Sequence, residues 1–413
     1  MKKNVHKIKI LSLSILFLFQ ACGTVSNEYI EESREPNNYK QVKHTESKID
    51  SIPLEGFASD SITDKNGNFY FATTDNNNFR IIKVDKYRDI VWANSYETTE
   101  KNANGIITID NSGNIFVSGD ASTEEGRKDI RTIKVSPDGE LIWSVKRETE
   151  KNDTVYDIET DSFGNLYIVG MLRRKTTSDN DDSFILKYTA SGLFEWSRVV
   201  TSKYFSFTSG IEIDKENTIY VSGITGRDIF FANYSTSGRQ KTYREYLDRD
   251  DQRAPVMSLG LDGYIYIAGK TSLKKADGHY LDKNANRLYI KKIDKNGREQ
   301  YFKIFDYSDD GEVIHAVTSD KYGNVYLYGE YYTKSRENYI AKLFLRQLSP
   351  SGETLYNKIY TGSSYGDNIG NGSELYINSK STLYIVDGFG QLKLKDNEKN
   401  YRSFILELSA TIE

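Results

Sequence analysis

Residues 158–170 read IETDSFGNLYIVG, and this stretch contains the pattern that decides the fold. Apolar and polar residues alternate on both sides of the pentapeptide DSFGN at 161–165, as they do in two short β-strands joined by a tight turn. The side chain of Asp161 can accept a hydrogen bond from the backbone two residues further on, and Gly164 can adopt the positive φ that such a turn requires. The stretch therefore predicts a β-hairpin.

The hairpin pattern recurs along most of the chain, with an aromatic residue two positions after the end of the turn. Seven copies lie at 61–73, 107–119, 158–170, 211–223, 257–269, 317–329 and 375–388. Their aligned aromatic residues are Tyr70, Phe116, Tyr167, Tyr220, Tyr266, Tyr326 and Tyr384. Successive aromatics are 46, 51, 53, 46, 60 and 58 residues apart, and a period near 50 is typical of propellers and repeat arrays.

A second hairpin pattern follows each copy of the first, often with Lys in its first strand and with Trp or Tyr in its second. Six copies lie at 81–92, 132–143, 185–196, 231–242, 290–301 and 345–356, and a seventh at 405–413 stops at the turn. Each unit therefore has four antiparallel strands. One such sheet cannot bury both of its faces, whereas sheets packed radially can, so the sequence predicts an all-β, seven-bladed β-propeller over residues 39–413.

The seventh unit lacks its fourth strand, and a spare strand precedes the first unit. Residues Tyr39–Thr45 are weakly apolar and lie between a polar segment and the first blade. We expect them to pair with Ser403–Leu408 and so to complete the last blade from the other end of the chain.

The first 21 residues have the features of an export signal. Ile10–Phe19 is an apolar stretch of ten residues after a basic start, which is too short to cross about 30 Å of hydrocarbon as a helix. The sequence Ala21-Cys22-Gly23 resembles the bacterial lipobox. This resemblance implies cleavage of residues 1–21 and a covalent diacylglycerol and N-acyl lipid at Cys22, and we interpret 22–38 as a lipidated, flexible tether.

The repeats resemble the bacterial seven-bladed β-propeller (SBBP-type) repeat family, which is often found in lipoproteins and surface proteins. The resemblance covers residues 57–413 and rests on the motif Asp-x-x-Gly-Asn-x-Tyr-Val-x-Gly. It implies an architecture and leaves the activity open, because one fold can host many functions. Together with Cys22 it implies a lipid-anchored protein of the bacterial cell envelope. The outer membrane is favoured, and the sequence leaves open whether the protein faces the periplasm or the outside.

Composition excludes several classes of protein. Loss of residues 1–21 would remove four Lys and no acids, which changes the formal net charge from −4 to −8. An acidic surface disfavours nucleic-acid binding, because that needs neutralisation of phosphates. The single Cys excludes an internal disulfide framework, and we expect a monomer with no cofactor besides the lipid.

The connections between strands divide into short turns at one end of the propeller and long, variable loops at the other. We expect the face with the long loops, and the channel mouth in it, to be the interaction surface. Three loop segments carry exposed aromatics that suit contact with a protein or glycan, and these candidate binding residues are Tyr204, Phe205, Phe207, Tyr331, Tyr332 and Tyr365. The alternative is that these rings cover blade edges.

Other motifs favour structural roles. The repeated aromatics and Trp92, Trp143 and Trp196 are expected in the blade core, and the repeated turn Asp residues are expected to cap hairpins. One Asp per turn is far below the six to eight oxygens of a calcium site. The segment with Asp306, Ser308 and Asp310 matches a calcium loop weakly, because Val317 occupies the position of its final acid.

Three functions remain open from the sequence. The first is a module that binds a protein, peptide or glycan, and the absence of hydrolase, metalloprotease and phosphate-loop motifs favours it over catalysis. The second is a glycan hydrolase or lyase with carboxylates at the loop face, which would place two acids about 5–10 Å apart. The third is a purely structural component of the envelope.

Overall fold

The computed structural model describes one compact unit within Arg34–Glu413. The residues it does not describe are 1–39, 41, 53, 55–57, 76–77, 98–100, 123–127, 149–151, 174–180, 202–204, 248–250, 273–286, 306–311, 336–337, 365–372, 379, 394–400 and 413. The signal peptide, Cys22 and the tether therefore lie outside the described residues.

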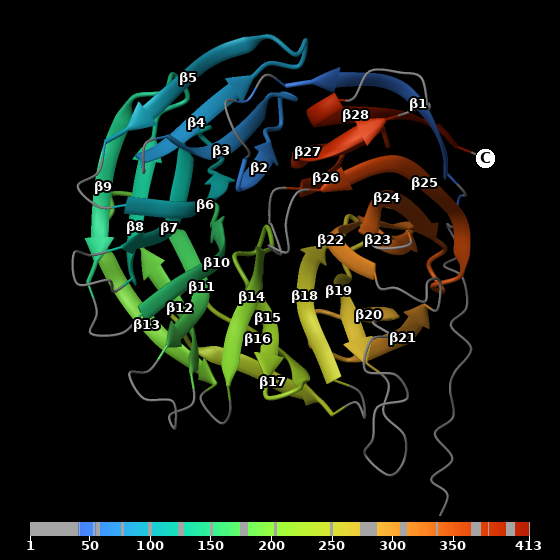
Figure 1. The fold of residues 1–413 in the computed structure, drawn as a ribbon. Coiled ribbons are helices and arrows are strands. Elements are labelled where there is room, and N and C mark those ends of the chain that lie inside the picture. The colour runs from blue at the N-terminus through green and yellow to red at the C-terminus, as the bar shows by residue number, and fades with distance from the viewer. Residues whose placement is uncertain are drawn as a thin grey trace, which may run out of the picture. The chain divides into compact units, whose positions relative to one another are not determined.

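The described chain forms a seven-bladed β-propeller, as the repeats predict, with four antiparallel strands in each blade (Figure 1). The first three blades contain β2 (Asp60–Thr63), β3 (Phe69–Asp75), β4 (Asn78–Val84), β5 (Ile90–Tyr96); β6 (Lys101–Ile109), β7 (Ile115–Ser122), β8 (Lys128–Val135), β9 (Leu141–Arg147); β10 (Asn152–Thr160), β11 (Leu166–Arg173), β12 (Asp182–Tyr188) and β13 (Phe194–Thr201). The next three contain β14 (Ser206–Ile213), β15 (Ile219–Thr225), β16 (Asp228–Tyr234), β17 (Gln240–Tyr246); β18 (Asp251–Leu259), β19 (Ile265–Ser272), β20 (Arg287–Ile293), β21 (Glu299–Phe305); β22 (Glu312–Ser319), β23 (Val325–Ser335), β24 (Asn338–Leu348) and β25 (Thr354–Ser364). In each blade the first strand lies at the centre of the ring and the fourth at the rim.

The seventh blade is assembled from both ends of the described chain. It contains β26 (Ser373–Ile377), β27 (Leu383–Lys393), β28 (Tyr401–Ile412) and, as its outer strand, β1 (Val42–Ser51). Strand β1 pairs antiparallel with β28 from Val42 opposite Ile412 to Ser51 opposite Phe404. The predicted closure is confirmed, but the pairing is longer and extends further toward the end of the chain than the expected partner segment 403–408.

Arg88 links the closing blade to the first one. Its guanidinium contacts Asp50 of β1 at 3.2 Å and Glu407 of β28 at 3.2 Å, and it lies over the ring of Phe69. The residue occupies the turn position that is Gly in most copies of the second hairpin, and it has a φ of 81°. Arg88 thus has a strained backbone conformation, and its side chain connects blade one to blade seven.

The hydrophobic core lies between blades and is divided into clusters, each shared by two neighbours. In β3, Tyr70 and Ala72 pack into a cluster with blade two, whereas Phe69 and Phe71 pack into a cluster with blade seven. Successive residues of a strand point to opposite faces of its sheet, and both faces are covered here. This is why the second strand of each blade begins with a run of mostly apolar residues. Six of the seven aligned aromatics are buried, as expected, and Tyr384 is partly buried.

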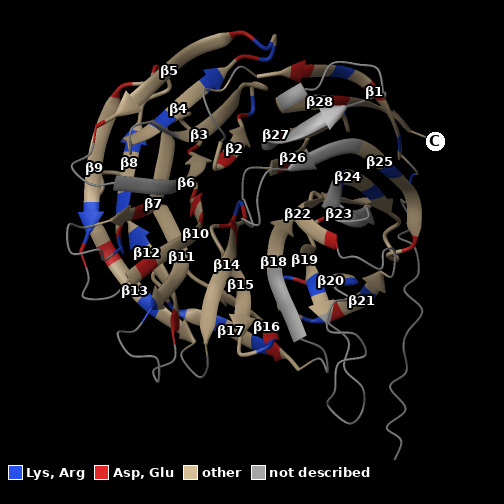
Figure 2. Cartoon of the chain, viewed as in Figure 1, with Lys and Arg blue, Asp and Glu red and all other residues tan. Residues whose placement is uncertain are grey.

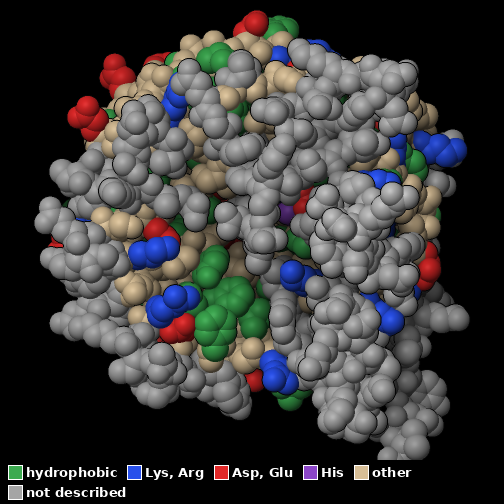
Figure 3. Space-filling model, viewed as in Figure 1, with side chains coloured by type: hydrophobic (Ala, Val, Ile, Leu, Met, Phe, Trp, Pro, Cys, Tyr) green, Lys and Arg blue, Asp and Glu red, His purple; other side chains and the backbone are tan. Residues whose placement is uncertain are grey.

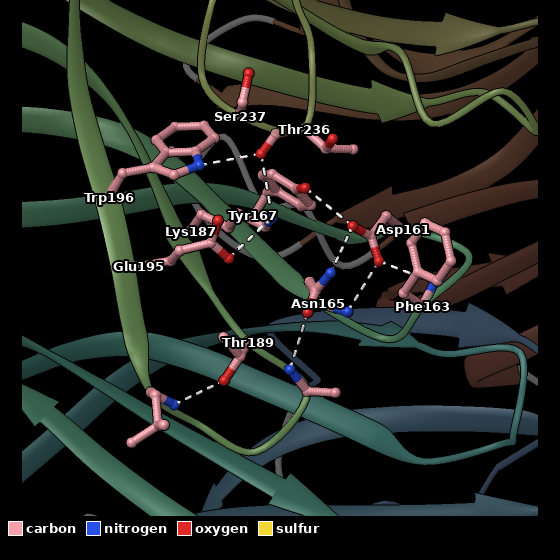
Figure 4. Close-up of polar contacts among 12 residues, drawn as sticks. Asp161, Phe163, Asn165, Tyr167, Lys187, Thr189, Glu195, Trp196, Thr236 and Ser237 are labelled. Atoms are coloured by element: carbon pink, nitrogen blue, oxygen red, sulfur yellow. Dashed lines mark hydrogen bonds and ion pairs between the residues drawn. The ribbon is translucent and has the colours of Figure 1, made fainter.

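In blades one, three and six, the Asp, Asn and Tyr of the first hairpin form one hydrogen-bonded group, and Figure 4 shows the group of blade three. In the third blade, Asp161 accepts bonds from the backbone N–H groups of Phe163 and Asn165, at 3.0 Å each. Its second oxygen accepts bonds from the Asn165 side chain at 2.9 Å and from the Tyr167 hydroxyl at 2.9 Å. The capping role predicted for the turn Asp is confirmed, and the Asn and Tyr of the motif are its partners.

The Lys and Trp of the second hairpin connect each of the first three blades to the next one. Lys187 and Trp196 of blade three both donate to the carbonyl oxygen of Thr236 in a turn of blade four, at 3.1 Å each. Lys187 also lies over the ring of Tyr167 and contacts Glu195 at 3.0 Å (Figure 4). Equivalent pairs in blades one and two donate to the carbonyl oxygens of Pro137 and Ala190.

Several segments that the sequence predicts as loops are extensions of strands. Tyr331 and Tyr332, expected in a loop, belong to the β23–β24 hairpin, in which pairing continues as far as Ser335 opposite Asn338. Residues 361–364 of β25 leave β24 and pair with β27 of the last blade. Loop length was predicted from the end of the repeat motif, whereas strand length depends on how far a partner strand continues alongside.

Candidate functional site

The centre of the ring holds a cavity of about 270 Å³, and the innermost strand of every blade contributes to its wall. Figure 2 shows acidic positions on these innermost strands. The carboxylates in the wall are Asp60, Asp157, Glu159, Glu212 and Glu374, and none of the described residues in the wall is Lys or Arg.

Three side chains reach the cavity because their strands are interrupted by β-bulges. Tyr156 in β10, Ser209 in β14 and His315 in β22 are each the extra residue at a shift of register, and each lies in the wall of the cavity. A bulge redirects one side chain without ending the strand.

The last Gly of the first repeat motif explains where these bulges occur. A Cβ atom on Gly170 would lie 1.9 Å from the carbonyl oxygen of Thr154, and one on Gly223 would lie 2.0 Å from that of Phe207. Only glycine allows the bulged strand to approach its neighbour this closely. The fixed place of this glycine in the repeat therefore determines where the neighbouring strand can bulge and which side chain turns toward the cavity.

Two of the carboxylates connect the innermost strands of adjoining blades. Asp60 accepts the backbone N–H of Ser61 and, in the next blade, that of Ile107, at 2.9 Å each. Asp157 accepts the N–H of Ile158 at 2.8 Å and that of Ile211 in the next blade at 2.9 Å. An ionised carboxylate can serve two donors in this way because both of its oxygens are acceptors.

Two Glu side chains make similar connections. The carboxylate of Glu374 accepts the hydroxyl of Thr63 in blade one at 2.7 Å, and that of Glu159 accepts the hydroxyl of Thr108 in blade two at 3.3 Å. These acids therefore hold the inner wall together and also give it negative charge.

The surroundings of these acids favour their neutral forms. Burial raises the pKa of Asp157, Glu159 and Glu374 to about 7. Burial also raises the pKa of Asp60 and Glu212 well above the usual carboxyl range, and neighbouring carboxylates raise both further. Bonds from backbone N–H groups oppose these shifts because they stabilise the charged form. Near neutral pH the wall therefore contains both carboxyls and carboxylates.

An aromatic cluster adjoins the cavity. The rings of Tyr156 and Phe207 are 5.2 Å apart between centroids, and those of Phe207 and Phe205 are 5.9 Å apart. Phe205 has 48% of its surface exposed, and Tyr156 lies in the cavity wall. Figure 3 shows hydrophobic side chains gathered over β14 to β16 beside the centre of the ring. The cluster offers an apolar surface at the entrance to an acidic cavity.

The structure places only part of the predicted site. Phe205 and Phe207 belong to the aromatic cluster. Phe207 lies at the start of β14, whereas a loop was expected there. Tyr331 and Tyr332 lie in β23 and pair with Lys342 and Ala341, so their backbone is strand where a loop was expected. The other candidates, Tyr204, Tyr365, Asp306, Ser308 and Asp310, lie outside the described residues.

The sequence analysis missed the cavity carboxylates, although the repeats contain a signal for them. Asp60, Asp157 and Glu374 each stand four residues before the first residue of the turn, and Glu159 and Glu212 stand two residues before it. Positions two apart in a strand share one face, so acids at these places line one surface. The signal therefore lies in fixed columns of the repeat, two and four residues before the turn.

Within the described residues, no three His, Cys, Asp or Glu side chains are grouped so as to hold a metal ion. No helix in the described part of the chain is long and apolar enough to cross a membrane.

The fold and its cavity define the class of this protein as a seven-bladed β-propeller with an acid-lined centre. No protein-family model matches the chain. An uncharacterised WD repeat-containing protein of Acanthamoeba polyphaga mimivirus is 22% identical over 125 residues, which are 25% of this chain and 9% of that protein. The chain therefore matches about a tenth of the length of this curated relative.

Solved structures resemble the chain in fold. An ulvan lyase of polysaccharide lyase family 25 aligns with a TM-score of 0.50 and 11% identity over 88% of this chain and 93% of its own. A member of the DUF4221 family from Bacteroides vulgatus aligns with a TM-score of 0.42 and 11% identity, over 91% of this chain and 99% of its own. At these identities the likeness concerns the fold alone.

Proposed function

We propose that the protein is an envelope-anchored lipoprotein whose propeller binds a protein, peptide or glycan ligand at the loop-face entrance of the central cavity. The observation that carries this proposal is the aromatic cluster of Tyr156, Phe207 and Phe205 beside the cavity. Aromatic side chains supply large contact areas with few rotatable bonds and are enriched at binding sites. The lipid at Cys22 would keep this surface at the membrane.

A site-specific photocrosslink tests the binding surface. A benzophenone amino acid at Phe205 should capture a discrete partner in intact source cells, since this ring is exposed beside the cavity. The matched control is the same substitution at Phe163, which is 73% exposed in a strand turn at the opposite end of the blades. Identical capture from both sites, or capture from neither, would argue against a binding surface at the loop face.

Fractionation and lipid labelling of the same cells test the proposed lipid anchor at Cys22. In a variant with Cys22→Ala, the protein should leave the membrane fraction and lose label from a lipid precursor. Retention of the label in this variant would show that the lipid is not attached to Cys22.

A glycan hydrolase or lyase is the second candidate, and one observation favours it. Asp157 and Glu159 lie two residues apart on the cavity side of β10, and their pKa values of about 7 suit acid–base chemistry near neutral pH. Both carboxylates also accept backbone N–H bonds, which a structural link explains without catalysis. Turnover of a polysaccharide panel that is abolished by Glu159→Gln would favour the enzyme over the binding module.

A further inference from the structure

The cavity wall contains polar groups that take no part in the hydrogen bonds between blades. These groups indicate what kind of ligand the proposed binding site can hold. Ser61 is only 6% exposed, and its hydroxyl has no hydrogen-bond partner among the described residues. The same holds for the hydroxyl of Ser209. Nε2 of His315, whose side chain is 10% exposed, also has no hydrogen bond, but it lies 3.8 Å from a carboxylate oxygen of Glu330. All three residues line the cavity. Buried polar atoms are normally paired, so unpaired ones in a cavity wall indicate a missing partner.

The chemistry of the wall indicates the kind of partner. Hydroxyl and carboxylate oxygens can both accept hydrogen bonds. The bonds from backbone N–H groups use only part of the capacity of the five carboxylates, since each oxygen has two acceptor sites. A wall that is rich in acceptors and lacks Lys and Arg among its described residues complements a donor with positive charge.

The volume of the cavity limits the size of the donor group that can enter it. Pockets for drug-sized ligands have volumes of about 300–1,000 Å³, and this one is smaller, at about 270 Å³. The acids are distributed over blades one, three, four and seven, so they surround a group that enters along the axis of the ring. The aromatic cluster at the entrance can contact both an alkyl stem and a cation.

We infer that the central cavity binds a primary ammonium group on a slender stem, as a lysine side chain of a partner or a polyamine would present it. The ammonium has three N–H donors, and the carboxylates and the unpaired hydroxyls of Ser61 and Ser209 are the acceptors available to them. The stem would lie against Phe205 and Phe207. This inference rests on the proposed binding function and names the chemistry that the site recognises.

Cation binding would also move protons. The titratable groups that face the cavity in the described part of the chain are Asp60, Tyr156, Asp157, Glu159, Glu212, His315 and Glu374. A positive charge among them favours the ionised carboxyls, several of which are partly protonated near pH 7. Binding of an ammonium should therefore release protons, whereas binding of a neutral sugar should not.

Titration calorimetry with the full chain tests the inference, with acetyl-trilysine-amide and spermidine as probes and acetyl-triglycine-amide as the neutral control. We expect saturable binding of at least one cationic probe at pH 7 and none of the neutral peptide. The measured heat should differ between phosphate and Tris buffers, because released protons are taken up by the buffer. Binding of trilysine alone identifies a peptide side chain as the source of the ammonium, and binding of spermidine alone identifies a polyamine.

Variants locate the binding. Glu159→Gln should weaken the cationic probe about tenfold or more, since a hydrogen bond to a charged group is lost. Asp138→Asn makes the same change of charge on an exposed turn residue and should leave the affinity unchanged. Ser61→Ala, which removes no hydrogen bond of the described fold, should weaken binding even if Glu159→Gln fails to fold.

The outcomes separate this inference from the function on which it rests. Binding of neither cationic probe, or binding that Glu159→Gln and Ser61→Ala leave unchanged, would overturn the ammonium site. If the Phe205 photocrosslink still captures a partner in that case, the binding module stands with a ligand of another chemistry. Loss of the photocrosslink together with saturable, Ser61-dependent binding of spermidine would retain the site and remove the macromolecular partner.

Discussion

Arg88 combines a strained backbone conformation with a side chain that stabilises the fold. A residue other than Gly costs about 1–2 kcal/mol in the left-handed region, because its Cβ approaches the following carbonyl oxygen. Arg88 has a φ of 81°, yet its guanidinium is largely buried between Asp50 and Glu407 and lies over Phe69. Removal of a buried partner from charged groups costs about 1–3 kcal/mol or more. With two carboxylates involved, the ion pairs outweigh the strain.

Arg88→Gly should therefore destabilise the protein by about 2 kcal/mol, although it relieves the backbone. Ser381→Gly is the matched control, because Ser381 occupies a left-handed turn position in the last blade with a φ of 63° and no ion pair. Its effect should be within about 1 kcal/mol of zero, since relief of strain and the added freedom of the unfolded chain nearly cancel. Melting temperatures of the two variants provide the measurement. Equal losses would show that the ion pairs contribute nothing.

At the scale of strands and turns, the sequence predicted the hairpins and missed the bulges. Asp161, Asn165 and Tyr167 interact within one hairpin, so a local pattern was enough to predict their turn. Lys187 and Trp196 act on the neighbouring blade, and no local pattern identifies that contact. The same limit applies to the site. The sequence predicts Phe207 as a loop aromatic, whereas its contact with Tyr156 arises from the bulge in β10.

Strand β1 is the element whose removal should matter most. Besides its pairing with β28, its first residue accepts a hydrogen bond from the Gln347 side chain at its carbonyl oxygen, at 2.7 Å. A chain that begins at Ile52 should melt at a markedly lower temperature than one that begins at Lys40, because the ring then ends in an unpaired strand. Thermal unfolding followed by circular dichroism compares the two. Coincident melting curves would mean that β1 is dispensable for closure.

At the scale of the whole molecule, the acids around the cavity couple stability to pH. The unfolded chain loses the protons of ordinary carboxyls near pH 4, whereas Asp157, Glu159 and Glu374 keep theirs in the folded state up to about pH 7. Between these values the folded state binds more protons, so its stability falls as the pH rises. Above about pH 7 these groups add no further change.

The melting temperature should therefore be higher near pH 5 than near pH 8. Asp157→Asn should flatten part of this decrease, because the amide does not titrate. Thermal melts over a series of pH values test both statements at constant ionic strength. A melting temperature that rises from pH 5 to pH 8 would mean that these acids are ionised throughout the range.

Closure of the ring by β1 and β28 has a consequence for how the protein is made. The hydroxyl of Ser47 in β1 donates to the carbonyl oxygen of Glu407 in β28 across 360 residues of sequence, so β28 is synthesised long after β1. At about 5–20 residues per second this interval lasts roughly 20–70 s, during which β1 has an open edge. Unpaired edges are where chains associate wrongly. Newly made molecules would therefore present this edge to other chains until β28 emerges.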